Sequence, residues 1–354
     1  MKQENYLITE ALKDIISQTE IIDDLEVMIK GKMHQFRQHE PIEEHNGDLN
    51  SFGNNQPLKG ASLRFHFQQF LSSLLYANFY CGNSNDLEKQ LPPKKERDEF
   101  MQTLSEANTT KTGYDYYWQV YNIDQAGNIF VSKNEYVKQL LPNTYVFSNS
   151  SIQKPELKTY VHLIRYKEDK NAQPVFYYLF GEKMQHSTIN LSRIYFNITA
   201  QGAPLLVNQV SLLFNKYSIP FSFKCLNHSD LYTRNDSAVL YIEKQYLNIA
   251  SALLNNIIPV IRPYLKPYVP LFTMMIHPGI SFAEDPGNGN SFGMHRCTML
   301  AGALMEIRGQ KLKNEQEKLD IVHQYLAAHG LQLNHPYLNT HTQVVPVFSK
   351  QLNL

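Results

Sequence analysis

The sequence predicts an α+β fold, with a largely antiparallel sheet flanked by helices and a mainly helical N-terminal region. Apolar residues recur at helical spacing early in the chain, whereas segments rich in Tyr, Val, Ile and Phe follow residue 113. Strands and helices then succeed one another without the regular βαβ alternation of a parallel sheet. With 43% hydrophobic and 19% charged residues among 354, the composition is that of a packed globular protein.

The N-terminal region, residues 1–110, is expected to begin with a long helix. Apolar residues from Ile8 to Leu25 have helical spacing, and Gly31 supplies a stop. The stretch 31–60 is polar and rich in Gly, Asn and Pro, which predicts a long loop. This half of the region is therefore expected to consist of one helix and one loop.

A second helix is expected from Ser62, a suitable N-cap, to Leu75, with a wide apolar face. The next stretch is polar and contains one short helix around Phe100. Near Gly113 the helical periodicity gives way to strand periodicity. This change predicts a domain boundary, so that residues 114–354 form an α+β domain.

The α+β domain is predicted from a succession of strand-like and amphipathic segments. Aromatic and β-branched runs indicate the strands, and apolar faces at helical spacing indicate the helices. A Gly- and Asn-rich stretch at 277–290 predicts a loop. The expected strands are 114–123, 129–132, 159–166, 174–181, 192–199, 219–226 and 237–244, and the expected helices are 205–217, 246–260, 291–308 and 315–328.

Composition excludes several classes of function. Lys and Arg together number 33, as do Asp and Glu, so no net charge attracts the protein to nucleic acid or to an anionic membrane. Cys81, Cys225 and Cys297 lie far apart, which argues against a disulfide framework and agrees with a reducing cytoplasm. No stretch resembles a signal peptide or reaches the ~18 apolar residues of a membrane span, so the mature protein is expected to begin near Met1.

Motifs for a metal or an organic cofactor are absent. The sequence lacks HExxH and GxxxxGK[ST], which zinc peptidases and P-loop proteins require. No pair among the thirteen histidines has the spacing of metal ligands on a predicted element. Gly287, Gly289 and Gly293 do not follow a strand with the spacing of a dinucleotide-binding loop. We therefore expect neither a metal nor a cofactor.

The segment AEDPGNGNSFGMHR, residues 283–296, brings a glycine-rich loop to the start of a helix. Free backbone N–H groups at a helix start, together with the guanidinium of Arg296, form an anion site even in a neutral protein. In an equally weighted interpretation, Ser291 is only an N-cap and Arg296 only part of a surface ion pair. Glu284 and Asp285 either brace the arginine or simply lie in the loop.

Lys224 stands in mid-strand between Phe223 and Cys225, so its side chain points away from an apolar face. Partial desolvation and neighbouring cations favour a neutral amine, the form that acts as a general base. The alternative, which has the larger prior weight for an isolated lysine, is a side chain that extends into solvent from an exposed sheet face. The sequence alone leaves both interpretations open.

Further candidates lie near this strand. Arg234 follows ten residues on in a loop, and Tyr241 lies in the next strand. In the alternative, structural interpretation, Arg234 forms an ion pair with Asp236 and Tyr241 is a half-buried core residue. Arg193 and Tyr195 share the polar face of an earlier strand, and such a face indicates either solvent or a site.

The order and spacing of several segments are similar to those of a known family. The segments are YFNITAQGA, IPFSFKCL, LYTRNDSAVLY, VPLFT and AEDPGNGNSFGMHRC, between about Ser192 and Ala303. Together they resemble the HopA-type effector family, which includes type III secreted proteins of plant pathogens and stand-alone enzymes of ribosomal peptide gene clusters. The resemblance covers roughly the C-terminal two thirds of the chain. A weaker resemblance links the same segment to bacterial phosphothreonine lyases.

The resemblance implies a cytoplasmic lyase like those of class V lanthipeptide and related pathways. Such an enzyme removes phosphate from phosphoserine or phosphothreonine after a separate kinase has installed it, and leaves dehydroalanine or dehydrobutyrine. Its implied partners are the phosphorylated precursor peptide and the peptide kinase, with no nucleic acid and no membrane. No metal or organic cofactor is implied.

The resemblance also implies roles for individual residues. The general base corresponds to Lys224, and Tyr241 positions the amide or the leaving oxygen. The lyases carry a Lys-x-His pair where this chain has Arg193 and Tyr195, so a tyrosine stands where those enzymes have a histidine acid. The proton donor is therefore Tyr195 or, as alternatives, His295 or His186. The implied phosphate ligands are Arg193, Arg234 and Arg296, and the supporting residues are Asp236, Asp285 and His295.

Two other functions stay open. A non-catalytic, effector-like module would recognise a phosphorylated or acidic partner through the same arginines. A subunit that presents peptide to the kinase would instead depend on a leader segment. The peptide-binding surface is also open, because aromatic rings either line such a surface or fill the core. The rings concerned are those of Tyr116, Tyr117, Trp118, Tyr177 and Tyr178.

Overall fold

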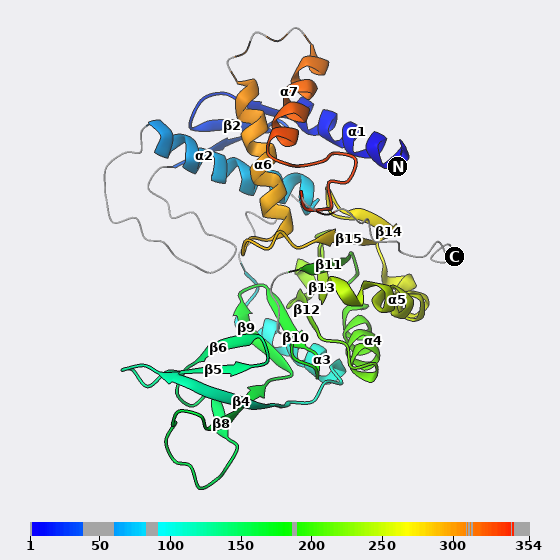
Figure 1. Ribbon diagram of the computed structural model, residues 1–354. Coiled ribbons are helices and arrows are strands. Elements are labelled where there is room, and N and C mark those ends of the chain that lie inside the picture. The colour runs from blue at the N-terminus through cyan, green and yellow to red at the C-terminus, as the bar shows by residue number, and fades with distance from the viewer. Residues whose placement is uncertain are drawn as a thin grey trace.

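The computed structural model describes residues 2–37, 60–82, 91–185, 190–308 and 314–340, together with residues 310, 312 and 342. Figure 1 shows a helical layer at one end, a central sheet with helices beside it, and a second sheet at the other end. Every strand pair in the described part of the chain is antiparallel. The predicted α+β fold with a largely antiparallel sheet is therefore confirmed.

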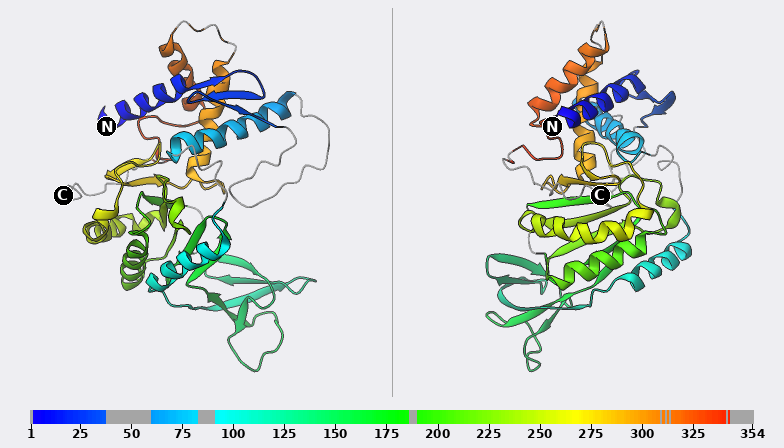
Figure 2. Two further views of the ribbon diagram at one scale, coloured as in Figure 1. Left: turned by 180° about the vertical axis from the view of Figure 1, so that it is seen from behind. Right: turned by 90° about the vertical axis from the view of Figure 1, so that its right-hand side faces the viewer.

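The central sheet has seven strands in the order β14-β15-β11-β13-β12-β10-β9. Helices α4 (Ala203–Lys216) and α5 (Leu247–Ile261) cover one of its faces, as the right-hand view of Figure 2 shows. Apolar side chains on that face are buried beneath them, as the alternation of strand residues requires. The strands are β9 Glu168–Gln173, β10 Phe176–Phe180, β11 Leu191–Phe196, β12 Phe221–Leu226, β13 Ala238–Glu243, β14 Met274–His277 and β15 Ile280–Glu284.

The helical layer joins segments from both ends of the chain. Helix α2 packs on α6, and α1 packs on α7 (Figure 1). One hydrophobic core contains residues of these helices and of the central sheet. The predicted division at residues 110–114 remains a prediction, but the N-terminal helices share this core with the C-terminal ones. The bounds are α1 Lys2–Gln18, α2 Gly60–Leu75, α6 Phe292–Ile307 and α7 Glu315–Ala328.

The prediction of a first helix reaching Leu25 is wrong, because α1 ends at Gln18 and a three-stranded sheet follows. The carboxylate of Asp23 accepts hydrogen bonds from the backbone N–H groups of Leu25 and Glu26, which turns the chain back on itself. Gly31, expected to stop the helix, lies at a positive φ of 75° in the next turn. The strands are β1 Thr19–Ile21, β2 Glu26–Ile29 and β3 Lys32–Gln35, and the rest of the predicted loop, from residue 38 to 59, lies outside the described residues.

Other boundaries differ less. Helix α2 begins at Gly60, so Ser62 lies in its first turn and is not its N-cap. Segment 277–290 was predicted as a loop, but β15 lies within it and all five of its residues are buried. Its neighbour β14 and the polar strand β9 have no apolar alternation that marks them in the sequence. The other predicted strands and helices of the α+β domain are present, and the short helix around Phe100 is α3, Lys94–Ala107.

A second sheet has five strands in the order β6-β5-β4-β8-β7 and its own small core around Trp118. Residue Tyr117 lies at an irregularity of β4 with φ 62°. The side chains of Tyr116 and Tyr117 are 50% and 66% exposed, whereas Trp118 is fully buried. The strands are β4 Gly113–Ile123, β5 Ile129–Lys133, β6 Tyr136–Leu140, β7 Tyr145–Phe147 and β8 Tyr160–Arg165.

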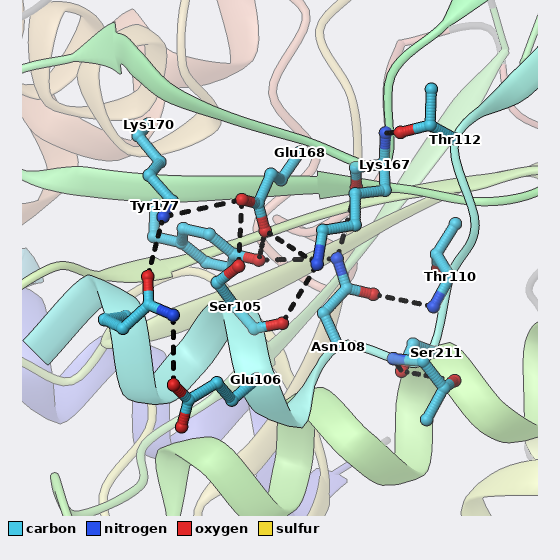
Figure 3. A network of polar contacts seen from close by, with 12 residues as sticks. Ser105, Glu106, Asn108, Thr110, Thr112, Lys167, Glu168, Lys170, Tyr177 and Ser211 are labelled. Carbon is cyan, nitrogen blue, oxygen red and sulfur yellow. Dashed lines mark hydrogen bonds and ion pairs between the residues drawn. The ribbon is translucent and has the colours of Figure 1, made fainter.

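Tyr177 and Tyr178, adjacent on β10, lie on opposite faces of the central sheet. Figure 3 shows the polar network that surrounds Tyr177: its hydroxyl donates to Glu168 Oε2 over 2.6 Å, and Ser105 on α3 donates to Glu168 Oε1 over 2.9 Å. This network fixes α3 against the sheet. Tyr177 is therefore a structural residue, while Tyr178 lies on the face that carries the predicted site residues.

Candidate functional site

The register of the central sheet gathers the predicted site residues on one face. Arg193 on β11 lies opposite Tyr241 on β13, and Lys224 on β12 lies opposite both Val239 on β13 and Tyr178 on β10. Directly opposed residues in antiparallel strands point to the same side of the sheet. We call this side the Lys224 face. It is the face opposite to the one that α4 and α5 cover.

Three aromatic rings surround the amine of Lys224. Its Nζ lies 4.2 Å from the ring centroid of Phe176, 5.7 Å from that of Tyr178 and 6.0 Å from that of Tyr241. The amine also donates a hydrogen bond to Gln173 Oε1 over 3.4 Å. Lys224 is half-buried, so the interpretation of a lysine extended into open solvent does not describe it. Ring faces attract a cation, which holds the amine on this face.

Arg234 reaches the same group of rings from the loop after β12. Its Nε and Nη2 donate to the two carboxylate oxygens of Asp236, each over 2.8 Å, and Nη2 also donates to Tyr76 Oη over 2.9 Å. The guanidinium carbon lies 5.9 Å from the centroid of Phe176, the ring that Lys224 also contacts. The ion pair with Asp236 that the sequence suggested is thus present, and it lies beside Lys224.

The Asp236 carboxylate is buried and remains ionised because of its neighbours. Burial alone would raise its pKa, but Arg234, the hydroxyl of Tyr76 and the charge of Lys224 together hold the pKa below its ordinary value. The pKa of Arg234 is in turn raised, since Asp236 outweighs the effect of burial. This fixed pair orients the guanidinium at the edge of the site.

Tyr76 belongs to the N-terminal region and carries no recognisable motif. It opens a π-helical turn, η1 (Tyr76–Tyr80), that continues α2, and its ring stacks on that of Tyr80 with centroids 5.0 Å apart. Gly293 on α6 permits this approach, because a Cβ there would lie 2.5 Å from the Tyr80 ring and 2.6 Å from the Tyr76 ring. The sequence signal, two tyrosines four residues apart at a helix end, was too common to identify the residue.

Arg193 is the second guanidinium of the Lys224 face. Its Nε and Nη2 lie 2.7 and 2.6 Å from Asp285 Oδ2, and Nη2 donates to the carbonyl of Asn290 over 3.2 Å. Its guanidinium carbon lies 5.2 Å from the centroid of Tyr241, a ring that Lys224 contacts as well. Asp285 therefore braces Arg193, and the expectation that it braces Arg296 is wrong.

Tyr195 lies two residues along β11 from Arg193 and is 3% exposed. Its hydroxyl has no hydrogen-bond partner of good geometry among the residues that the structure describes, and the same holds for Tyr80. Burial raises the pKa of Tyr195 to about 12, against the opposing charge of Arg193. The phenol thus keeps its proton at neutral pH, as a proton donor must.

Arg296, expected to bind phosphate, makes other contacts. Its Nε and Nη2 donate to the carbonyl oxygens of Pro336 and Leu338 over 2.9 and 2.8 Å, and Nη1 lies 2.8 Å from His295 Nδ1. The side chain is 3% exposed, so the alternative of a surface ion pair is wrong as well. Within the described ranges no carboxylate lies within ion-pair distance of it. Arg296 clamps the C-terminal segment against the first turn of α6.

The same contacts weaken the case for His295 as proton donor. Burial, and then the charge of Arg296, lower the pKa of His295 to about 4, so its imidazole is neutral at pH 7. Burial also lowers the pKa of Arg296 to about 10, against the opposing effects of Tyr195 and Glu284. His186, the other alternative donor, lies outside the described residues.

Residues 289–293 read GNSFG and so match the GxSxG pattern of α/β-hydrolases. That pattern requires a serine on a sharp turn that joins a strand directly to a helix. Here residues 285–291 separate β15 from α6, and the Ser291 hydroxyl accepts a hydrogen bond from the backbone N–H of Met294 over 3.2 Å. Ser291 is thus the N-cap of α6, as one of the two sequence interpretations proposed.

Three further features of the described residues bear on the kind of site. No three His, Cys, Asp or Glu side chains there lie together as metal ligands. None of the described helices is long and apolar enough to cross a bilayer. Cys81, Cys225 and Cys297 are buried and free.

Comparisons with known proteins find a family similar to part of the chain. Residues 167–338 match the HopA1 effector protein family. The structure of the effector protein from Pseudomonas syringae pv. tomato strain DC3000 is similar at 18% identity and a TM-score of 0.42, over 78% of this chain and 95% of that one. The effector from P. syringae pv. syringae strain 61 is similar at 15% identity and a TM-score of 0.41, over 78% and 97% of the two chains.

A search of curated proteins finds no match to this chain. The matched residues include Lys224, Arg193, Arg234 and their carboxylate partners, but not Tyr76. Residues 167–338 of the chain are therefore similar to the HopA-type effector family, in agreement with the resemblance of the sequence segments.

Proposed function

We propose that the protein is a phosphoserine/phosphothreonine lyase that acts on a ribosomal precursor peptide. The observation that carries this proposal is the grouping of one amine and two guanidinium groups around shared rings. Lys224 and Arg234 contact Phe176, while Lys224 and Arg193 contact Tyr241. A phosphorylated side chain bound there would present a dianion to the arginines and its backbone Cα–H to the lysine.

The reaction is a β-elimination. The neutral amine of Lys224 removes the Cα proton, the electron pair of that C–H bond forms the Cα=Cβ bond, and the Cβ–O bond breaks. Phosphate leaves with the electrons of the broken bond and is held by Arg193 and Arg234, which stabilise the charge that develops on it. The products are inorganic phosphate and dehydroalanine or dehydrobutyrine. No oxidant or reductant is consumed.

Two tyrosines complete the scheme. Tyr195 retains its proton at neutral pH and is the proposed donor to the leaving oxygen. Tyr241 lies between Arg193 and Lys224 and is proposed to position the substrate amide. The contacts of Arg296 favour a structural role, so the scheme now assigns phosphate binding to two arginines and not to three.

The proposed setting is a cytoplasmic biosynthetic pathway with two further partners. A separate kinase phosphorylates the precursor peptide, and this protein then removes the phosphate. Buried free cysteines, as found here, are compatible with a reducing compartment.

The proposal is tested with a phosphoserine- or phosphothreonine-containing peptide and the purified protein. A lyase releases inorganic phosphate and lowers the peptide mass by phosphoric acid, and the unsaturated product then adds a thiol. If phosphate is released and the hydroxyl is restored, the protein is a phosphatase and the proposal is wrong.

The second candidate is a non-catalytic module that binds a phosphorylated or acidic partner. One observation favours it: three rings around Lys224 stabilise the charged ammonium, the form that binds an anion and not the form that removes a proton. Lys224→Ala separates the two. A lyase loses turnover and retains much of its phosphopeptide affinity, whereas a binding module shows no turnover before or after the change.

A further inference from the structure

The N-terminal region contributes a side chain to the candidate phosphate site. Tyr76 lies 158 residues before Arg234 in the sequence, yet the Tyr76 hydroxyl accepts a hydrogen bond from Arg234 Nη2 over 2.9 Å. The same hydroxyl donates to Asp236 Oδ2 over 2.9 Å. One hydroxyl thus uses its donor on the carboxylate and an acceptor site on the guanidinium, closing a ring of three residues.

The surroundings make this ring rigid. The side chains of Arg234 and Asp236 are 11% and 7% exposed, and the Tyr76 ring stacks on Tyr80 with an interplanar angle of 15°. Gly293 holds both tyrosine rings close against α6. Buried hydrogen bonds between charged groups and a hydroxyl are stronger than those in water and are directional. Arg234 is therefore held at one orientation, with Phe176 and Lys224 beside it.

Orientation of a guanidinium matters for a phosphate ligand, because its N–H groups form a planar fork that must align with the phosphate oxygens. Asp236 balances the charge of Arg234, but both residues lie in the same segment, between β12 and β13. Tyr76 is anchored in a different element, η1, and connects that loop to the helical layer.

We propose that Tyr76 is a positioning residue for Arg234, so that residues of the N-terminal region form part of the phosphate site. This inference rests on the proposed function only in the identity of the ligand, a phosphorylated peptide side chain. It assigns a role to a part of the chain outside residues 167–338.

The test uses the full chain with Tyr76→Phe, which keeps the ring and removes the hydroxyl. Turnover of a phosphopeptide and binding of inorganic phosphate are measured together. We expect KM for the peptide and Kd for phosphate to rise about 10-fold, since the hydrogen bonds of this hydroxyl to Arg234 and Asp236 are both lost. We expect kcat to change less than about twofold, because the base, Lys224, is untouched.

Tyr177→Phe is the matched control. Tyr177 is also a buried tyrosine whose hydroxyl donates to a carboxylate, that of Glu168 (Figure 3). It lies on the face of the sheet opposite to Lys224, because it pairs with Cys225 and not with Lys224. It loses the same kind of hydrogen bond, and we expect it to leave KM and the phosphate Kd unchanged. If both variants raise Kd equally, the effect of Tyr76 is general destabilisation and the inference is wrong.

Asp236→Asn is a second variant, in case Tyr76→Phe does not fold. It removes the negative charge that pairs with Arg234. We expect it to weaken phosphate binding at least as much as Tyr76→Phe does. Unchanged Kd values in the folded variants would overturn the inference. If the wild-type protein binds phosphate but turns over no phosphopeptide, the proposed lyase function fails, whereas a weaker Kd for Tyr76→Phe would still support the positioning role.

Discussion

The two faces of the central sheet have the same strands but opposite chemistry. Along β12, Phe223 and Cys225 are fully buried under α4 and α5, while Lys224 between them lies among rings and cations on the other side. The apolar face is stabilised mainly by burial of its side chains, with the hydrogen bonds of Tyr177 at the α3 side. The cations of the Lys224 face are balanced by carboxylates outside the strands, Asp236 for Arg234 and Asp285 for Arg193. Successive residues of a strand point to opposite faces of the sheet. The residues that stabilise the core and those of the candidate site therefore lie on different sides of β12.

The largest expected effect is on the Lys224 face. We expect Lys224→Ala to lower kcat/KM for a phosphopeptide on the order of 10³-fold, because the proton acceptor is lost. The melting temperature should change little, since the side chain is half-buried and leaves rings that can pack together. Phosphate release and thermal unfolding measure the two effects. Lys216→Ala, an exposed lysine beside Tyr217 on the α4 side, is the matched control and should retain full activity.

Substitution of Phe223, the neighbouring residue on the apolar face, should lower stability and leave turnover almost unchanged. We expect Phe223→Ala to lower the free energy of unfolding by about 3–4 kcal/mol, because it leaves a cavity in a fully buried region. Denaturant unfolding measures this loss. At temperatures where the variant remains folded, turnover per folded molecule should be close to that of the wild type. A selective loss of turnover would show that the two faces are not separate.

Substitution of Arg296 tests whether this residue belongs to the cation sites of the Lys224 face. We expect Arg296→Met to lower the free energy of unfolding by about 2–3 kcal/mol, because the carbonyls of Pro336 and Leu338 lose a charged donor. Hydrogen exchange should become faster in the segment around residue 338. Arg64→Met, which removes an exposed pair with Glu306, should change stability by less than about 0.5 kcal/mol. A large loss of phosphate affinity in Arg296→Met without loss of stability would restore Arg296 as a phosphate ligand.

The smallest expected effect is a pH dependence from His295. Its pKa is about 4 in the folded protein and near 6.5 when unfolded, so the unfolded chain binds more protons between these values. Its contribution to stability is therefore complete above about pH 6.5 and is lost as the pH falls towards 4. We expect a loss of about 1–2 kcal/mol after allowance for partial exposure. Unfolding curves of wild type and His295→Asn at pH 7 and pH 4.5 measure it; equal pH slopes would contradict the prediction.

Local, periodic signals in the sequence predicted most of the strands and helices of the α+β domain correctly. Alternation along β11 and β12 placed Arg193, Tyr195 and Lys224 on polar faces, because the period of two is a property of the strand itself. Sequence reasoning failed at the first helix, where Asp23 turns the chain back before the apolar spacing ends. It also failed for β15, because neighbouring Gly and Asn residues masked a short buried strand.

The hydrogen-bond and ion-pair partners of the site residues could not be inferred from the sequence. Arg296 at a helix start has the sequence signature of an anion site whether its partner is a phosphate or two backbone carbonyls. Asp285 pairs with Arg193, 92 residues away, and not with its neighbour Arg296. Tyr76 carries only the common signal of two tyrosines at a helix end, and it joins the site through the packing of η1 against α6.

The amino-acid sequence by itself determined the α+β class, the side of each strand on which the charged residues lie, and the similarity of residues 167–338 to the HopA1 effector protein family. The tertiary structure decided which carboxylate holds which arginine, and it brought a tyrosine from the helical layer into the site. The reason is physical. Periodicity is set by backbone geometry over a few residues, whereas the partner of a buried charge is set by contacts across long loops, which depend on how the whole chain packs.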